Sequence, residues 1–564
     1  MNTYRPHAAD AAFILFDVLQ AHDTLAQLPA LADNADRDLM RQVLDEAGKF
    51  VGQVVAPLNR PGDEIGAQYE NGAVTMPPGF RDAYQAFWRA GWPALSHAPE
   101  HGGQGLPTVL EMVLYEWLSA ANHGWTMAPG LLHGASECIR QHGSPELRAR
   151  YLEKVATGEW LATMCLTEPH AGSDLGLART KAVPLPDGRY ALSGTKIFIS
   201  GGEHDLSDNI VHLVLARLPD AVPGPKGLSL FLVPKFYDDG RRSAVVCERI
   251  EEKMGLHGSP TCVMRFDEAA GWLVGEPGKG LNAMFVMMNA ARLHVALQGV
   301  GLLDAAWQKA DAYARERRQM RAPGPRDASQ PADPIIRHPA VQRLLDTQRA
   351  WIDAGRVLAY RTAVELDVAR HDPDPERRRQ AGDWCALVTP VLKAAWTDQA
   401  FQGASDCLQV FGGHGYVREW GIEQIVRDSR VAMIYEGTNE IQAQDLLFRK
   451  VLADEGRALS GLLEGLEADL EGDASAAGAR ARTGLAKLSD LLDALRTSGA
   501  TASENLHAVA GDFMRVAALA LMSWAWARLV RADAPGNGAT AFERWVWPEL
   551  SMRHGMVRQA LAAT

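Results

Sequence analysis

Hydrophobic residues recur at steps of three and four along most of the chain, and this spacing is lost only in its middle part. Residues 1–160 and 278–452 show the helical spacing, which predicts an all-helical N-terminal domain and a C-terminal four-helix bundle. Residues 161–277 instead carry short apolar or alternating runs bounded by Gly, Pro and Asp, which predicts antiparallel strands in a small β-barrel or sandwich. The pattern therefore predicts an α+β fold with the strands between two helical regions.

Helical spacing continues over residues 453–564, which we expect to form an additional helical domain. A strongly apolar run begins at Leu519, but it is shorter than the roughly 20 residues that cross a membrane, and Arg515 and Arg528 bracket it. We therefore expect no membrane span.

Composition narrows the class of protein. A chain of 564 residues is too long for one hydrophobic core, and 47% hydrophobic with 22% charged residues is ordinary for a soluble enzyme. The formal net charge of −12 argues against a nucleic-acid partner, whose phosphates require a basic surface. The six cysteines lack a CxxC pair, which argues against a disulfide framework and a zinc site. The N-terminus lacks a basic start and a small-residue cleavage site, so we expect a cytoplasmic protein.

The stretch from Leu408 to Lys450 contains the candidate catalytic group. It predicts the end of a helix, a double-glycine turn, a short helix near 420–427, an extended passage and a new helix from about Thr438. Glu436 lies in the hinge before that helix, after apolar residues that would raise its pKa towards that of a useful base. The other interpretation is a first-turn acid favoured by the helix dipole, and spacing alone leaves both open.

Three motifs in this stretch resemble the C-terminal signature of the acyl-CoA dehydrogenase family: GGHGY at 412–416, RD at 427–428 and IYEGTNEIQ at 434–442. The resemblance implies that Glu436 is the catalytic base. It also implies ligand contacts from the neighbouring residues, with Tyr435 and Gly437 at the substrate and Thr438 at the flavin.

The segment CLTEPHAGSD, residues 165–174, resembles a second signature of the family. Thr167 offers a hydroxyl, and the turn at Gly172 and Ser173 offers amides and a second hydroxyl to a polar ring edge or a phosphate. A Ser-Asp turn that ends a strand is the structural alternative. The resemblance implies flavin contacts from this segment and from the following strand: Met164, Leu166, Thr167, Gly172, Ser173, Phe198 and Ser200, with Ser173 also near the acyl-CoA.

Further FAD contacts are implied in the helical region that follows. Arg317 resembles the family arginine at the FAD pyrophosphate, and a planar guanidinium matches phosphate oxygens. Gln409 and Gly413 resemble residues that contact the cofactor across a subunit boundary, so the resemblance implies a homo-oligomer, either a dimer or a tetramer. Pro339 stands where relatives often carry an FAD-binding glutamine, and His257 stands where many carry arginine.

The motif KMGLHGSPTCVM, residues 253–264, is similar to that of a longer subgroup of the family that includes methylmercaptopropionyl-CoA dehydrogenase. The resemblance implies an FAD-dependent enzyme that desaturates an acyl-CoA to a trans-2-enoyl-CoA, with 3-methylthiopropanoyl-CoA as a candidate substrate. Glu436 would take the α-proton, and the β-hydrogen would leave as hydride to flavin N5. Electrons would pass to an electron-transfer flavoprotein.

Two other functions stay open at this point. One is an acyl-CoA oxidase that reoxidises its flavin with oxygen, and the other is a flavin-retaining, nucleic-acid-binding relative with little activity. The additional domain over 453–564 would serve subunit packing or cover the CoA end.

Overall fold

The computed structural model describes residues 3–325, 328–497 and 504–562. The chain separates into two compact units, each discontinuous in sequence. Unit 1 comprises Met1–Gly52, Pro107–Ala121 and Val295–Thr564, and unit 2 comprises Gln53–Leu106 and Asn122–His294. The four-domain division expected from the sequence is a different partition, and it stays a prediction.

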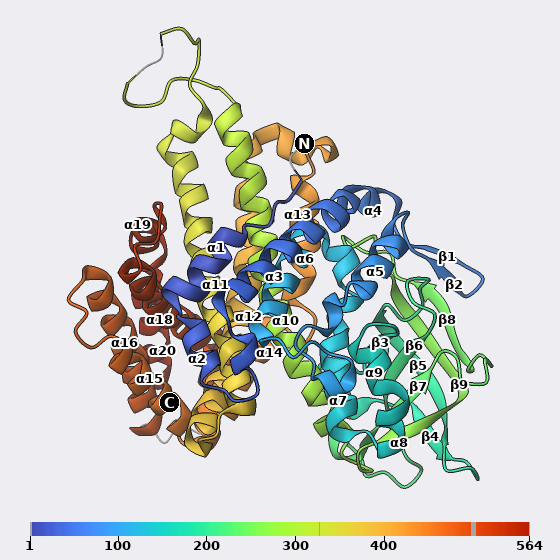
Figure 1. The fold of residues 1–564 in the computed structure, drawn as a ribbon. Helices are drawn as coiled ribbons and strands as arrows, with labels where there is room; N and C mark the ends of the chain where they lie inside the picture. The colour runs from blue at the N-terminus through green and yellow to red at the C-terminus, as the bar shows by residue number, and fades with distance from the viewer. Residues whose placement is uncertain (1–2, 326–327, 498–503, 563–564) are drawn as a thin grey trace. The chain divides into compact units, whose positions relative to one another are not determined.

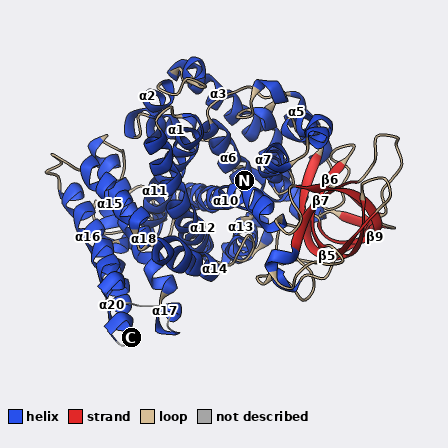
Figure 2. Cartoon of the chain, turned by 90° about the horizontal axis from the view of Figure 1, so that it is seen from below, coloured by secondary structure: helices blue, strands red, loops and turns tan. Residues whose placement is uncertain are grey.

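Unit 1 is built from helices (Figures 1 and 2), two of which, α6 and α10, continue into unit 2. Its α-helices are α1 (Ala8–Ala12), α2 (Ala21–Ala26), α3 (Arg37–Phe50), α6 (Thr108–Thr126), α10 (Gly280–Glu316), α11 (Pro339–His371), α12 (Pro375–Phe411), α13 (Ile422–Ser429), α14 (Asn439–Gln444), α15 (Arg457–Asp469), α16 (Ala476–Thr497), α17 (Glu504–Ala508), α18 (Ala510–Arg531), α19 (Gly538–Ala541) and α20 (Glu549–Ala562).

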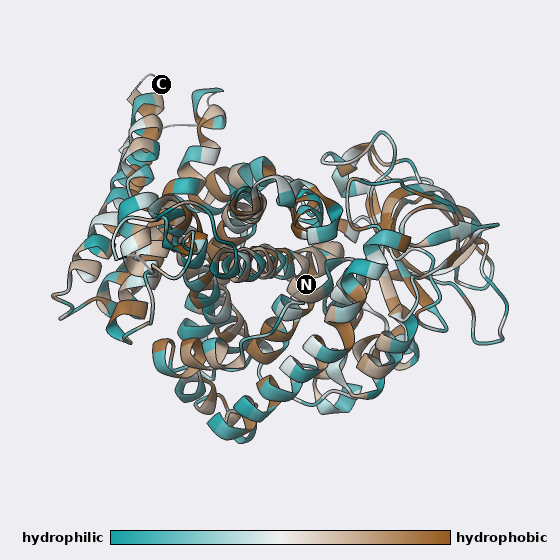
Figure 3. Ribbon diagram, turned by 90° about the horizontal axis from the view of Figure 1, so that it is seen from above, coloured by the Kyte–Doolittle hydropathy of each residue, from teal (hydrophilic) through white to brown (hydrophobic). Residues whose placement is uncertain are grey.

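The C-terminal extension packs onto the long helices of unit 1. Helices α15 and α18 contact α12, and α18 also contacts α11. Hydrophobic and hydrophilic residues share the same helices (Figure 3), as expected where one face of a helix is turned to a core. Helix α18 differs: it is long and apolar enough to cross a membrane, but 83% of its most apolar window is buried inside the fold. Among the described residues, this one candidate span is therefore a core helix.

A buried ion cluster fastens three helices of unit 1. The Arg356 guanidinium on α11 donates to Glu116 on α6 and to Asp304 on α10, each at 2.8 Å. The Tyr360 hydroxyl donates to the other Glu116 oxygen at 2.6 Å, and the Tyr4 hydroxyl donates to Asp304 at 3.1 Å. A buried guanidinium is tolerated only with such partners, so the cluster fixes how α6, α10 and α11 align.

Unit 2 combines short helices with a sheet (Figure 2). Its elements, apart from the shared ends of α6 and α10, are α4 (Asn59–Ile65), β1 (Gln68–Glu70), β2 (Ala73–Thr75), α5 (Phe80–Arg89), α7 (Leu132–His142), α8 (Pro145–Leu147), α9 (Glu153–Ala156), β3 (Leu161–Cys165), β4 (Lys181–Pro184), β5 (Tyr190–Ser200), β6 (Ile210–Arg217), β7 (Leu228–Pro234), β8 (Val245–Ile250) and β9 (Thr261–Val274).

Five strands of the seven-stranded sheet close into a ring. Strand β6 pairs with β4, β4 with β5, β5 with β9, β9 with β7, and β7 again with β6. The remaining strands, β3 and β8, extend the ring at β6 and β9. The expected α+β fold with a central β-barrel is therefore confirmed. The barrel encloses an apolar core that includes Phe231, Val233 and Phe266.

The sheet is mixed, which corrects the expectation of antiparallel strands alone. Strand β3 pairs with β6 in parallel, with Leu161 opposite Ile210 and Cys165 opposite Val214. Both strands are buried almost throughout, and uninterrupted apolar runs of this kind are typical of parallel strands covered on both faces. Hydrophobicity alone does not distinguish such a strand from a core strand of an antiparallel sheet.

A β-hairpin also corrects the prediction that residues 1–160 contain helices only. Strands β1 and β2 pair around Asn71 and Gly72, whose φ angles are 51° and 85°. Asn-Gly is the strongest short signal for a tight hairpin turn, because both residues tolerate positive φ. The strands have three residues each and are mostly exposed, so the hydrophobic pattern gives no sign of them.

Two histidines are buried in unit 2 beside the barrel strands. The Nδ1 atom of His212 lies 2.8 Å from the Thr163 hydroxyl. Burial, together with the charges of Lys235 and Arg242, lowers the pKa of His212 to about 3. Burial likewise lowers the pKa of His204 to about 3. Both imidazoles are therefore neutral at pH 7.

These histidines make unit 2 sensitive to acid. A histidine whose pKa falls from about 6.5 to about 3 on folding stabilises the protein fully above pH 6.5 and loses that contribution as the pH falls. Between pH 7 and pH 5 each such histidine costs about 2 kcal/mol of unfolding free energy. We predict that His212→Gln reduces the pH 7 to pH 5 loss by about 2 kcal/mol in urea unfolding. The exposed control His7→Gln should leave the loss unchanged, and an equal loss in His212→Gln and wild type would contradict the assignment.

Candidate active site

The first group of predicted site residues surrounds Glu436 in unit 1. The sequence predicts an extended chain before Glu436. The structure instead has a 3₁₀ turn over Arg430–Met433. The amides of Ile434 and Tyr435 both donate to the carbonyl of Val431. The alternating apolar residues that suggest a strand therefore belong to a tight turn, because two local hydrogen bonds close it.

Glu436 lies in the left-handed region of the backbone with a φ of 54°, and Gly437 follows with a φ of 84°. Two consecutive left-handed residues reverse the chain, and glycine adopts this conformation without the steric cost that glutamate incurs. A Cβ at residue 437 would lie 2.6 Å from the Gln442 side-chain nitrogen, so a larger residue would both strain the backbone and displace this side chain. Thr438 then caps α14 by accepting a hydrogen bond from the Ile441 amide, as the sequence predicts.

Side chains from three helices hold this reversal, which we call the Glu436 turn and define as residues 435–438. Tyr435 donates to Gln298 on α10, Gln442 on α14 donates to the Glu436 carbonyl at 3.1 Å, and Lys393 on α12 donates to the Gly437 carbonyl at 2.7 Å. Burial raises the pKa of the Tyr435 phenol, and the charge of Glu436 raises it further. The phenol therefore stays a neutral donor, and side-chain donors hold the carbonyls of Glu436 and Gly437.

The second group, Arg317, Gln409 and Gly413, is exposed on unit 1. Tyr313 is on α10, four residues before Arg317, which follows the end of that helix. The Tyr313 ring stacks on Phe411 with centroids 4.2 Å apart. Phe411 stands two residues after Gln409 and two before Gly413. This stacked pair brings all three predicted residues to the same end of the helices, and the sequence gives no sign of it.

His414 completes the second group. Its Nδ1 atom lies 2.9 Å from the Tyr313 hydroxyl, and its ring stacks on Trp420 at 4.6 Å. The double-glycine segment is thus a rigid 3₁₀ turn rather than a loose connection. Nothing lies within 4 Å of a Cβ built on Gly413, so the backbone there is open to a bound group.

The third group lies in unit 2, where the segment after β3 meets β5. The Ile197 amide donates to the Thr167 carbonyl at 2.9 Å, and the buried Lys196 ammonium donates to the Leu166 carbonyl at 3.0 Å. Leu166 and Thr167 therefore lie beside the part of β5 that carries Phe198. Phe198 has a φ of 58°, in a bulge where the pairing of β5 with β9 shifts register, and 60% of its surface is exposed.

Glu168 makes the third group rigid. Its carboxylate accepts hydrogen bonds from Lys196 at 2.8 Å, from the Thr180 hydroxyl at 2.6 Å and from the amides of Arg179 and Thr180. Burial alone would raise the pKa of Glu168, but Lys196 and these donors lower it to about 2. A charged carboxylate thus fastens the loop that carries Gly172 and Ser173, both of which are exposed.

The remaining predicted residues of the third group lie close by in the chain. Met164 is buried on β3, and Ser200, which is partly exposed, ends β5. Nothing lies within 4 Å of a Cβ built on Gly172, which leaves space beside the loop.

Two positions that depart from the family pattern have structural roles. The His257 Nδ1 atom lies 2.9 Å from the Asp63 carboxylate, and its Nε2 atom lies 3.1 Å from the Lys253 carbonyl. His257 therefore ties its loop to α4 within unit 2. Pro339 is the first residue of α11, a position that suits proline because it needs no amide donor.

Comparison with protein families decides what these groups belong to. Residues 38–159, 163–269 and 278–450 match the N-terminal, middle and C-terminal domains of acyl-CoA dehydrogenase. The chain belongs to the acyl-CoA dehydrogenase family. Acyl-CoA dehydrogenases are flavin oxidoreductases with FAD as cofactor, so the expected enzyme class and cofactor are confirmed.

Individual relatives of this acyl-CoA dehydrogenase agree with the family assignment. The chain is 44% identical to 3-methylmercaptopropionyl-CoA dehydrogenase of Ruegeria pomeroyi, over 88% of this chain and 85% of that protein. Its fold is similar to that of Caenorhabditis elegans ACDH-11 in complex with C11-CoA, with 18% identity and a TM-score of 0.76 over 100% of this chain and 93% of that one. It is also similar to an acyl-CoA dehydrogenase complexed with FAD from Bacillus anthracis, with 21% identity and a TM-score of 0.72 over 95% and 88% of the two chains.

The residues of the third group suit a flavin. An aromatic side chain as exposed as Phe198 offers a flat apolar surface to a planar ring system. The hydroxyls of Thr167, Ser173 and Ser200 can serve polar ring edges or phosphates, and the space beside Gly172 admits a ligand.

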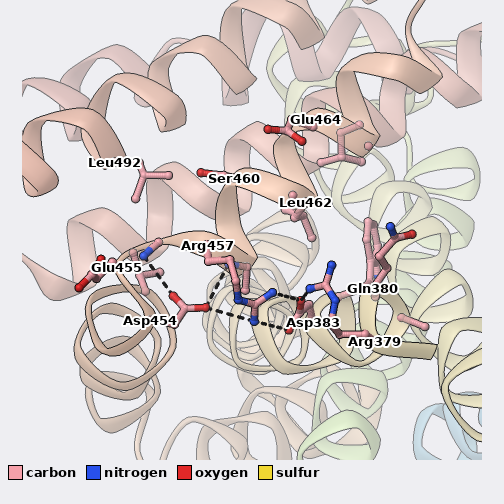
Figure 4. A pocket seen from close by; sticks show the side chains of 18 of the residues that line it. Arg379, Gln380, Asp383, Asp454, Glu455, Arg457, Ser460, Leu462, Glu464 and Leu492 are labelled. Atoms are coloured by element: carbon pink, nitrogen blue, oxygen red, sulfur yellow. Dashed lines mark hydrogen bonds and ion pairs between the residues drawn. The ribbon is translucent and has the colours of Figure 1, made fainter. Parts of the chain in front are cut away.

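The cavity drawn in Figure 4 lies elsewhere in unit 1. It has a volume of about 1200 Å³ and opens between α12, α15 and α16. Arg457 at its rim pairs with Asp383 at 2.7 Å, and Arg379 pairs with the same carboxylate. None of the described residues that line it is a predicted site residue.

Phe198 yields a prediction with opposite effects on stability and binding. A phenylalanine at positive φ is strained, so Phe198→Gly should stabilise the apoprotein by about 1 kcal/mol in urea unfolding. The same change removes the exposed ring and should weaken FAD binding about tenfold in a fluorescence titration. Glu268→Gly is the matched control, because Glu268 is exposed in unit 2 with a φ of 58°. It should stabilise the fold equally without changing FAD affinity, and unchanged affinity in Phe198→Gly would refute a flavin contact.

Proposed function

We propose that this enzyme desaturates an acyl-CoA thioester between its α and β carbons to a trans-2-enoyl-CoA, with Glu436 as the base. The Glu436 turn carries this proposal. A glutamate held at positive φ is a strained arrangement, and such strain persists where neighbouring groups enforce it, most often at functional sites. The contacts from Gln298, Gln442 and Lys393 supply that enforcement.

The acidity of the substrate sets what the turn must do. A thioester α-proton is weakly acidic, so a carboxylate removes it efficiently only if the developing enolate oxygen is stabilised at the same time. We assign that stabilisation to the backbone amide of Glu436, in the same residue as the base. Tyr435 and Gly437 would then flank the thioester. FAD, when bound, supplies the acceptor for the β-hydride.

We propose flavin contacts for residues of each group, taken separately in the two units. Leu166, Thr167, Phe198 and Ser200 would hold the ring system, with Met164 behind them, and Gly172 and Ser173 would reach its polar parts. In unit 1, Arg317 would pair with the pyrophosphate, and Gln409, Gly413 and Thr438 would also contact the cofactor. The Thr438 oxygen accepts in the helix cap, which leaves its hydroxyl proton for a ligand.

The proposed homo-oligomer rests on the exposed surface of the second group. Tyr416 is 89% exposed and Val417 is 49% exposed, and both follow Gly413 within four residues. Apolar side chains so exposed beside a cofactor-binding segment are typical of an interface. We propose a homodimer or a dimer of dimers in the cytoplasm.

The proposed substrate is a short acyl-CoA with a thioether, 3-methylthiopropanoyl-CoA. Support comes from the 44% identical relative named for that substrate and from the match over 88% of this chain. A panel of acyl-CoAs from short to long, with and without the thioether, tests it by anaerobic bleaching of the flavin absorption. We expect the thioether substrate to give the highest kcat/KM. A higher kcat/KM for an unsubstituted chain would reassign the substrate.

The electron acceptor is a separate proposal, an electron-transfer flavoprotein. An acyl-CoA oxidase would instead react quickly with oxygen. We expect the substrate-reduced enzyme to persist in air and to be reoxidised on adding an electron-transfer flavoprotein. Rapid reoxidation in air would favour the oxidase.

The role of Glu436 can be tested by an isosteric change. We predict that Glu436→Gln binds FAD as wild type but slows anaerobic flavin reduction by about 10³-fold or more, because the amide cannot accept the α-proton. The control Glu440→Gln changes an exposed carboxylate on α14, four residues after Glu436, and should keep the wild-type rate. A wild-type rate in Glu436→Gln would place the base elsewhere.

A further inference from the structure

Lys393 on α12 is fully buried, which is rare for a lysine. Its ammonium donates to the Gly437 carbonyl at 2.7 Å and to the Asn439 side-chain oxygen at 2.8 Å. Burying an ammonium is costly unless acceptors surround it. Both of these acceptors belong to the residues just after Glu436, so this buried charge is directed at the Glu436 turn.

Asn439 connects the same helix to the start of α14. Its amide nitrogen donates to the Ala394 carbonyl at 3.1 Å, to the Thr397 hydroxyl at 3.0 Å and to the Asp398 carboxylate at 2.6 Å. Lys393 and Ala394 lie one helical turn before Thr397 and Asp398 on α12. The first residue of α14 is thus held at every polar atom of its side chain.

The carbonyls of Glu436 and Gly437 are held by side chains of two different helices. Gln442, which holds the Glu436 carbonyl, belongs to α14 and moves with the turn. Lys393 belongs to another helix, and α12 is itself packed along α11. The hydrogen bond from Lys393 therefore ties the turn to the helical scaffold, whereas that from Gln442 only shapes it.

We propose that Lys393 is a positioning residue for proton abstraction: by holding the Gly437 carbonyl it keeps residues 436 and 437 in the left-handed conformation and directs the Glu436 carboxylate at the substrate. The inference rests on the proposed function of Glu436. Without the ammonium, Glu436 can relax to negative φ, which is favoured by roughly 1–2 kcal/mol for a residue with a side chain. Such a rotation of the backbone moves the carboxylate away from its working position.

The test separates α-proton removal from hydride transfer. An acyl-CoA analogue with sulfur in place of the β carbon has no β-hydrogen, so it can exchange its α-hydrogens with deuterated solvent but cannot reduce the flavin. We expect Lys393→Met to slow this exchange about 10²-fold, as a displacement near 1 Å can do, while the analogue Kd and the FAD content stay within threefold of wild type. Lys393→Arg, which keeps a cationic donor, should recover part of the rate.

Thr362→Val is the matched control for lost stability. Thr362 is buried on α11, and its hydroxyl accepts from the Trp384 indole at 3.1 Å, so the change also leaves a buried group without its partner. It should lower the melting temperature comparably and leave the exchange rate at the wild-type value. If Lys393→Met does not fold, Lys393→Gln is measured instead, since an amide can still pair with Asn439.

Each outcome bears on the proposal. A folded, FAD-loaded Lys393→Met or Lys393→Gln protein with wild-type exchange overturns it. Failure of both variants to fold also overturns it, because the lysine would then serve the fold and not the reaction. Absence of exchange in the wild-type enzyme would instead overturn the proposed role of Glu436, so the two failures are distinguishable.

Discussion

The structure depends on one constraint: a cation removed from water must be surrounded by acceptors. Three lysine and arginine side chains are buried in the part of the chain that the structure describes: Lys196, Arg356 and Lys393. Each collects its acceptors from segments far apart in sequence, because local chain cannot supply them. Arg356 collects carboxylates from α6 and α10, and Lys196 collects Glu168 and the Leu166 carbonyl. A buried cation therefore acts as a connector between elements, and losing a partner is costly.

Two of these connectors stand beside strained residues of the proposed site. Lys196 precedes Phe198 by two residues on β5, and Lys393 bonds the residue after Glu436. Phe198 and Glu436 have φ angles of 58° and 54°, which residues other than glycine rarely adopt. Strain of this kind persists only where the surroundings impose it. Each unit thus has a buried ammonium near a predicted site residue whose backbone is in the left-handed region.

Sequence patterns predicted those features that local chemistry decides. Helical spacing gave the long helices, Thr438 was recognised as a cap, and the bounded apolar runs gave a barrel. The sequence patterns failed to predict features that depend on contacts between residues far apart in the chain. The passage before Glu436 has the alternation of a strand but forms a 3₁₀ turn, and β3 pairs in parallel with a strand that follows it by more than forty residues. Motif resemblance pointed to the segment that holds Glu436 and Gln442, but Gln298 and Lys393 lie outside these motifs, since their contacts with the turn exist only once the helices have packed.

The C-terminal extension illustrates the same limit. Its helices were expected to serve subunit packing or to cover a ligand, yet within unit 1 they also contact the helix that follows the Glu436 turn. Helix α18 packs on α14, the Gln444 side chain donates to the His507 carbonyl at 2.9 Å, and the His507 ring stacks on Phe448 at 4.2 Å. Helix α14 has six residues and continues as a π-helix over Asp445–Val451, and isolated helical segments this short are marginally stable in water. It therefore depends on α12 through Asn439 and on the extension through Gln444, so a segment about a hundred residues long supports the helix that follows the Glu436 turn.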